Sequence, residues 1–116
     1  MRGLRLALSI VLVAGFASSA CLGDRSATVI VTNETNRKVT VYPYGRQRDQ
    51  VKWVLEPGGV HNDDMPAGDA RADSPVALME AIDESGALIF CHRYSYGELK
   101  ALEGAVRIRE GKIDCS

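Results

Sequence analysis

The sequence predicts a mainly β domain: a small antiparallel β-sandwich or partly open barrel of roughly six to seven strands with one short helix. From residue 27 onward, apolar and β-branched residues alternate with polar ones, which is the two-residue period of a half-buried strand. Turn-forming residues interrupt these runs at roughly ten-residue spacing. One segment has the spacing of a helix start. We therefore expect residues 27–116 to form a single domain.

Four strands are expected in the first half of this domain. Residues 28–32 and 38–42 are β-branched runs joined by turn-forming residues, so they are predicted to pair as a hairpin. Residues 51–56 alternate apolar and charged side chains, which predicts a third strand with one buried face. Residues 60–62 are a short fourth candidate. Residues 63–74 are acidic, contain Gly and Pro and lack a period, so we expect a loop there.

The second half is more regular. Residues 76–82 and 87–92 are apolar runs separated by a turn that contains Gly, and they predict a second hairpin. Ser95 and Glu98 have the capping-box spacing, in which the hydroxyl bonds forward and the carboxylate reaches back, so a short helix should follow. Residues 106–109 alternate apolar and basic side chains, which predicts a final long strand that turns at residues 110–111 into residues 112–115.

The N-terminus has the layout of an export signal. Residues 1–5 include basic side chains, residues 6–16 are apolar, and small residues at 18–20 directly precede Cys21. The last four positions resemble the lipobox of bacterial lipoproteins, and the resemblance covers the leader alone. It implies cleavage before Cys21, diacylation of that cysteine and anchoring in a membrane. The apolar run is shorter than the ~20 residues that a spanning helix needs.

An ordinary signal peptidase is the alternative reading of the same leader. The third residue before the cut is Ser18, where the lipobox most often has Leu, and Ser18 with Ala20 also satisfies the ordinary enzyme at the same bond. Both readings give a signal peptide over residues 1–20 and a tether over residues 21–26. They differ in whether Cys21 carries lipid or begins a secreted, soluble protein.

The cysteine count supports the lipid independently. The chain has three cysteines, and an odd thiol in an exported protein needs an explanation. If Cys21 is acylated, Cys91 and Cys115 remain as a pair, and a disulfide is the usual fate of two thiols in an oxidising compartment. Two buried free thiols are the alternative. We expect the disulfide to hold the end of the chain against the strand that contains Cys91.

Charge excludes one class of partner. Loss of Arg2 and Arg5 with the leader lowers the basic residues from 14 to 12, against 15 acidic residues, for a net charge of −3. A mildly acidic chain of this kind offers no basic surface for nucleic acid.

One group of residues could hold a metal ion. His61, Asp63 and Asp64 begin the acidic stretch, with Asp69 and Asp73 further along. Histidine and carboxylates can bind Zn²⁺, and oxygen-rich loops can bind Ca²⁺. The spacing matches no standard motif, and solvated loop acids are the simpler interpretation.

Two other groups receive structural interpretations. Cys91 and His92, together with His61, have the residue types of a copper site. Adjacent residues on a strand point to opposite faces, however, and a disulfide at Cys91 would exclude a copper ligand there. Tyr42 and Tyr44 fall on one face of a predicted strand, where ordinary packing is the simpler interpretation and recognition the alternative.

The sequence therefore predicts an envelope lipoprotein with a non-catalytic binding or structural module, anchored through Cys21. We expect no enzyme, since the Gly-x-Ser-x-Gly pattern is absent from the sequence. We also expect no cofactor and no nucleic acid, and a protein partner in the envelope is left open. The alternatives are a metal-binding envelope protein that uses His61 and nearby carboxylates, and a secreted, non-lipidated inhibitor or effector.

Overall fold

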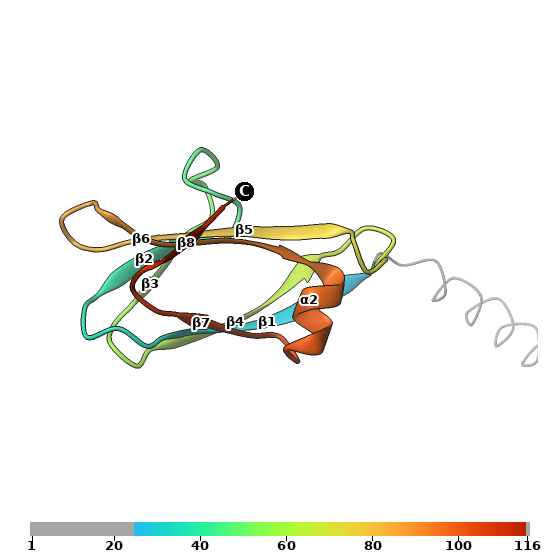
Figure 1. Ribbon diagram of the computed structural model, residues 1–116, viewed down its shortest axis with the longest axis horizontal. Helices are drawn as coiled ribbons and strands as arrows, with labels where there is room; N and C mark the ends of the chain where they lie inside the picture. The colour runs from blue at the N-terminus through green and yellow to red at the C-terminus, as the bar shows by residue number, and fades with distance from the viewer. Residues whose placement is uncertain (1–24, 116) are drawn as a thin grey trace, which may run out of the picture.

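The computed structural model of the protein describes residues 25–115, which form two packed β-sheets and one short helix (Figure 1). In spatial order, the three-stranded sheet consists of β4 (Val60–Pro66), β1 (Ser26–Asn33) and β7 (Ala105–Ile108). The five-stranded sheet consists of β3 (Trp53–Leu55), β2 (Val39–Tyr42), β5 (Pro75–Ile82), β6 (Leu88–Ser95) and β8 (Lys112–Asp114). The helix is α2 (Tyr96–Ala101). The predicted leader and Cys21 lie outside the described residues.

The predicted mainly β, sandwich-like fold with one short helix is confirmed for the described part of the chain, with eight strands in place of six to seven. The sheets are mixed and not purely antiparallel. Strand β7 runs parallel to β1, and β8 runs parallel to β6. Each of these pairs is joined by chain that crosses between the sheets, and such a crossover allows a parallel neighbour where a tight turn does not.

The predicted first hairpin is wrong, because β1 and β2 belong to different sheets. Asn33 ends β1 and is fully buried. Its side-chain amide donates to the carbonyls of Arg37 at 2.7 Å and Leu55 at 3.0 Å, while Oδ1 accepts from the backbone N–H and the hydroxyl of Thr35. These bonds turn the chain from one sheet to the other. The predicted second hairpin is confirmed, since β5 and β6 pair antiparallel.

The loop expected over residues 63–74 begins later than predicted, because β4 continues to Pro66. Met65, which is 1% exposed, pairs with Ala27 of β1, and Asp63 and Asp64 pair within the same ladder. Most side chains of β4 are exposed, so its composition lacks the apolar alternation that identifies a half-buried strand. The pairing with β1 makes this segment a strand.

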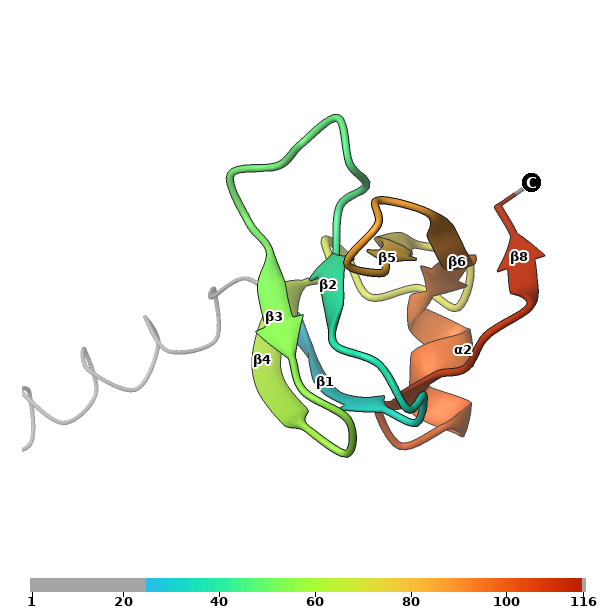
Figure 2. The ribbon, with the colours of Figure 1, turned by 90° about the vertical axis from the view of Figure 1, so that its left-hand side faces the viewer.

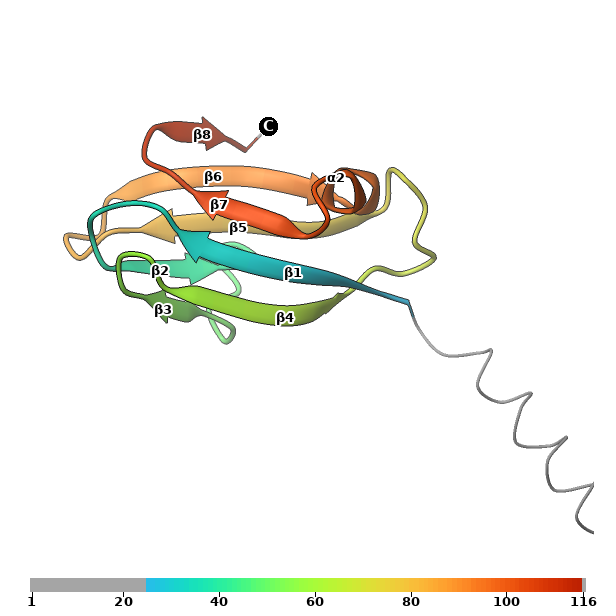
Figure 3. The same cartoon turned by 90° about the horizontal axis from the view of Figure 1, so that it is seen from below.

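The core lies between the two sheets. Seen from below, the three-stranded sheet lies in front of the five-stranded sheet (Figure 3). Val29 and Val31 of β1 point inward and are fully buried, as are Met79 of β5 and Phe90 of β6 on the opposite sheet. Ile108 of β7 completes this layer. Truncation of such a Phe to Ala typically costs about 3–5 kcal/mol, so this layer dominates the packing energy.

The helix begins where the sequence predicts, with the forward half of the capping box, while the Glu98 carboxylate contacts His92 Nε2 at 2.8 Å instead of reaching back to Ser95. The Ser95 hydroxyl accepts a hydrogen bond from the Glu98 backbone N–H at 3.2 Å. Two residues with positive φ, Glu103 at 54° and Gly104 at 79°, then redirect the chain into β7. Among residues 25–115, no helix has the length and apolar character to cross a membrane.

Candidate functional site

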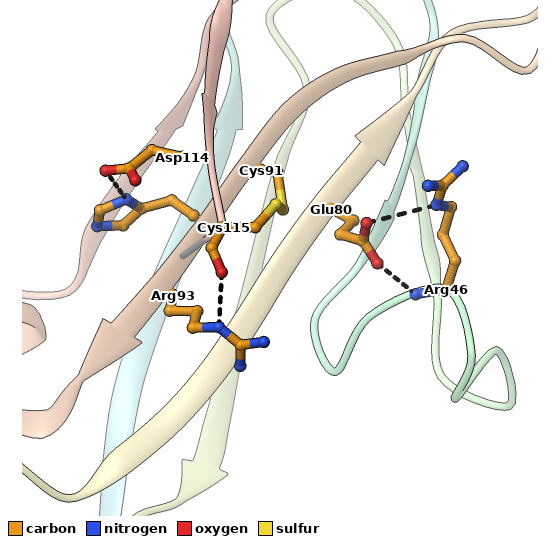
Figure 4. Close-up of a disulfide and its surroundings, with 7 residues drawn as sticks. Arg46, Glu80, Cys91, Arg93, Asp114 and Cys115 are labelled. Carbon is orange, nitrogen blue, oxygen red and sulfur yellow. Dashed lines mark hydrogen bonds and ion pairs between the residues drawn. A yellow bond between two sulfur atoms is a disulfide. The ribbon is translucent and has the colours of Figure 1, made fainter.

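The disulfide predicted between Cys91 and Cys115 is present (Figure 4). Their Cα atoms are 5.3 Å apart across 24 residues of sequence, and the bond fastens the end of the chain beyond β8 to strand β6. Cys91 is fully buried. It pairs with Glu80 in the antiparallel ladder, so both side chains lie on the same face of the five-stranded sheet, the face turned away from the core.

The connection between β2 and β3 folds over this outer face. The backbone N–H of Arg46 donates to one oxygen of Glu80 at 2.8 Å, and Arg46 Nε lies 3.5 Å from the other oxygen (Figure 4). Gly45 makes the approach possible, because its φ is +87° and a Cβ there would come within 2.9 Å of Leu78 Cδ2. Glu80 thus fastens the loop to the sheet.

A cavity of about 520 Å³ lies between this loop and the sheet. We call it the arginine cavity, and its lining residues are Tyr44, Gly45, Arg46, Gln47, Arg48, Leu78, Glu80 and Arg93. Three arginines and one glutamate line it. The lining of the cavity is therefore positively charged, whereas the chain as a whole has a net charge of −1.

Each arginine of the cavity contacts another part of the protein. Arg93 and Arg46 do so through one guanidinium nitrogen, and Arg48 does so through an aromatic ring. Arg93 Nε donates to the backbone oxygen of Cys115 at 2.7 Å, and Arg46 uses Nε toward Glu80. Both contacts use Nε, the guanidinium nitrogen bonded to the side-chain carbons. The two Nη groups of each arginine therefore lie beyond the contact. The Arg48 guanidinium lies over the ring of Tyr44, 5.4 Å from its centroid.

Tyr44 adds a hydrogen-bond donor at the wall of the cavity. Burial raises the pKa of Tyr44, the nearby charge of Asp63 raises it further, and Arg48 partly offsets these effects. The hydroxyl therefore stays protonated at neutral pH. Guanidinium groups and a phenol are donors suited to carboxylate or phosphate oxygens. The arrangement can hold an anionic group over an apolar floor formed by Leu78.

The residues of the predicted metal site have other surroundings. The His61 ring stacks on Trp53, with centroids 4.3 Å apart and planes 31° apart. Asp64 accepts a hydrogen bond from the Thr28 hydroxyl at 2.8 Å. Asp63 and Asp64 are neighbours on β4, so their side chains leave opposite faces of the sheet. The strand thus separates the two carboxylates expected beside His61.

The more distant acids of that prediction flank an arginine. Arg71 Nε lies 3.3 Å from Asp69 and 3.8 Å from Asp73. Within residues 25–115, the three possible metal ligands that lie together are Glu80, Cys91 and Cys115, and the two sulfurs are bonded to each other.

His92 lies on the opposite face of β6 from Cys91, as expected. Its Nε2 is 2.8 Å from a Glu98 oxygen, and its Nδ1 is 3.6 Å from an oxygen of Asp114. Its ring meets Tyr94 edge to face, with centroids 4.5 Å apart. Burial, with the charge of Glu98 as a smaller cause, raises the pKa of Tyr94 to about 12. The disulfide at Cys91 excludes the copper arrangement.

Sequence reasoning missed the arginine cavity. Arg46 and Arg48 follow Tyr44 in a short basic loop, which is a weak signal by itself. Glu80 and Arg93 lie on strands β5 and β6, and from the sequence they are interpreted as surface residues of a sheet. Only the fold brings these three segments together.

The chain shows no significant match to any protein-family model, to any curated protein or to any solved structure.

Proposed function

We propose that the protein is a lipid-anchored, non-catalytic binding module of the cell envelope, and that the arginine cavity holds an anionic group of its ligand. The cavity carries this proposal, because three guanidinium groups and one carboxylate give it a net positive charge in a chain of net charge −1. The carboxylate of Glu80 is bound by Arg46, so Glu80 positions the loop. Arginines that have no nucleophile and general base beside them favour ligand binding over catalysis.

Two observations support export and anchoring. The Cys91–Cys115 disulfide is typical of proteins in an oxidising compartment. Strand β1 begins at Ser26, five positions after the proposed lipid-bearing Cys21. A chain of that length spans at most about 17 Å, so a lipid on Cys21 keeps the domain close to the bilayer.

The anchoring is tested by the intact mass of the membrane-extracted protein and by the distribution of a Cys21→Ala variant. We expect a chain that begins at Cys21 with a diacylglyceryl-type adduct, and release of Cys21→Ala from the membrane fraction. A chain of the same length without an adduct identifies the secreted alternative.

Anion binding is tested with inorganic phosphate as the probe and the detergent-extracted mature protein as the receptor. We expect Arg48→Gln and Arg93→Gln each to weaken phosphate binding about tenfold, the loss expected for one charge-assisted hydrogen bond. Arg71→Gln is the matched control, because Arg71 lies in another loop between Asp69 and Asp73. Equal affinities for the four proteins, or no binding at millimolar phosphate, contradict the assignment of this cavity.

A further inference from the structure

One side of the sandwich is joined by an aromatic pair, and the other carries a groove. On the side of β3 and β4, the stacked rings of Trp53 and His61 join the sheets, and these strands lie next to each other in Figure 2. On the opposite side, a groove of about 610 Å³ runs beside β7. We call it the edge groove, and its walls include Tyr94, Leu102, Arg107, Arg109 and Lys112.

Strand β7 is the edge of the three-stranded sheet at this groove. It pairs with β1 on one side, and no other described strand pairs with it. The N–H groups of Ile30 and Glu34 donate to the carbonyls of Gly104 at 2.8 Å and Ile108 at 2.9 Å. Backbone groups alternate in direction along a strand, so the N–H and carbonyl of Arg107 and the carbonyl of Ala105 face the groove. The Ala105 N–H donates to the Leu102 carbonyl at 3.1 Å.

Basic side chains outnumber acidic ones among the residues that line this groove. Its one carboxylate, Glu110, lies 2.9 Å from Arg37. The side chains of Arg107 and Arg109 are 60% and 61% exposed, although both contact the single carboxylate of Glu34. Lys112 adds a third cation. Leu102, 42% exposed, offers an apolar surface at one end of the groove.

We propose that β7 binds an extended acidic segment of a partner protein, which adds to the three-stranded sheet as a fourth, antiparallel strand. The backbone of β7 supplies the hydrogen bonds, and Arg107, Arg109 and Lys112 select carboxylates on the segment. A second copy of this chain fits poorly, because β7 paired with β7 places arginines against arginines, and like charges across a ladder are destabilising. This inference does not depend on the arginine cavity, which lies on the other sheet.

The experiment measures binding of a capped six-residue peptide of alternating glutamate and valine to the mature protein. We expect saturable binding and slower amide exchange at Arg107. A peptide with the same side chains, N-methylated at alternate positions, should lose binding at least tenfold, because it cannot form the ladder. Equal binding of the N-methylated peptide overturns strand addition, and no binding of either peptide at millimolar concentration overturns the proposal as a whole.

Variants of the protein locate the surface. Arg107→Glu should weaken peptide binding at least tenfold and Arg107→Gln by a smaller factor, while Lys52→Glu, at an exposed position directly before β3, should leave it unchanged. Arg107→Gln retains a neutral polar side chain and keeps the test valid if charge reversal impairs folding. An effect of Lys52→Glu equal to that of Arg107→Glu, or concentration-dependent dimerisation that Arg107→Gln abolishes, contradicts the proposed partner.

Discussion

The side chain of Asn33, at the end of β1, donates a hydrogen bond of 3.0 Å to the backbone oxygen of Leu55 in β3, and so connects the two sheets. The same amide donates to Arg37 O, and its oxygen accepts twice from Thr35. All the polar atoms of this buried side chain are therefore bonded. A polar group that is fully satisfied at a sheet-to-sheet connection specifies where the chain crosses.

We expect Asn33→Ala to lower the free energy of unfolding by about 3 kcal/mol, because it removes the donor to the buried Leu55 carbonyl and the acceptor of both Thr35 hydrogen bonds. Asn36→Ala, in the same turn but exposed, should change it by less than about 0.5 kcal/mol. Urea denaturation followed by circular dichroism measures both. An Asn33→Ala protein as stable as the wild type contradicts the role assigned to this side chain.

The disulfide should stabilise the protein mainly by restricting the unfolded chain. Because its cysteines are 24 positions apart in sequence, the double variant Cys91→Ala/Cys115→Ala should lose about 3 kcal/mol of unfolding free energy. The reduced wild type is the comparison, and it should match the double variant. Amide exchange at Ile113 should accelerate in both, since β8 pairs with only three residues of β6. Unchanged stability of the double variant would count against this account.

Gly104 should tolerate a side chain less well than Gly86. Both have positive φ, at 79° and 87°, but a Cβ at Gly104 overlaps the carbonyl oxygen of Thr28, whereas one at Gly86 meets open space. We expect Gly86→Ala to cost about 1 kcal/mol from backbone strain alone and Gly104→Ala at least about 3 kcal/mol. Thermal and urea unfolding of the two variants provides the comparison, and similar losses contradict the steric explanation.

Asp83 should make the protein sensitive to acid. The Ser85 hydroxyl, followed by the backbone N–H groups of Ala87 and Ser85 and the Arg37 guanidinium, holds the pKa of Asp83 below its ordinary value of 3.8, although burial opposes this. The folded state therefore favours the ionised form. The resulting stabilisation is complete above the unfolded-state pKa of about 3.9 and is lost as the pH falls through the lower pKa of the folded state.

The variant Asp83→Asn removes this titration. We expect it to be less stable than the wild type at pH 7 and to lose less stability between pH 5 and pH 2.5, when both are measured by urea midpoint. Asp73→Asn, which replaces an exposed carboxylate with 85% of its side chain accessible, should keep the acid response of the wild type. Parallel pH profiles for Asp83→Asn and the wild type exclude Asp83 as the cause.

Several features of the fold follow from local sequence. The β5–β6 hairpin, the cap of α2 and the alternation of β1 depend on residues that are close in the chain, and the structure agrees with them. The disulfide between Cys91 and Cys115 also agrees with expectation, because two cysteines remain once Cys21 is assigned to the predicted lipid, and that count requires no geometry. The predicted lipid on Cys21 depends on the leader alone and stays a prediction.

Only the tertiary structure decided which strands pair and which surfaces form. A strand exposes equivalent backbone groups on both edges, so its own residues do not choose its neighbour. Asn33 sends the chain across to the second sheet, and β4 becomes a strand through its pairing with β1. The arginine cavity forms between a loop and two strands that are distant in sequence. The edge groove forms because one sheet has three strands and the other has five. Local side-chain periodicity carries no information about such long-range contacts. For this physical reason, neither the arginine cavity nor the edge groove could be predicted from the sequence.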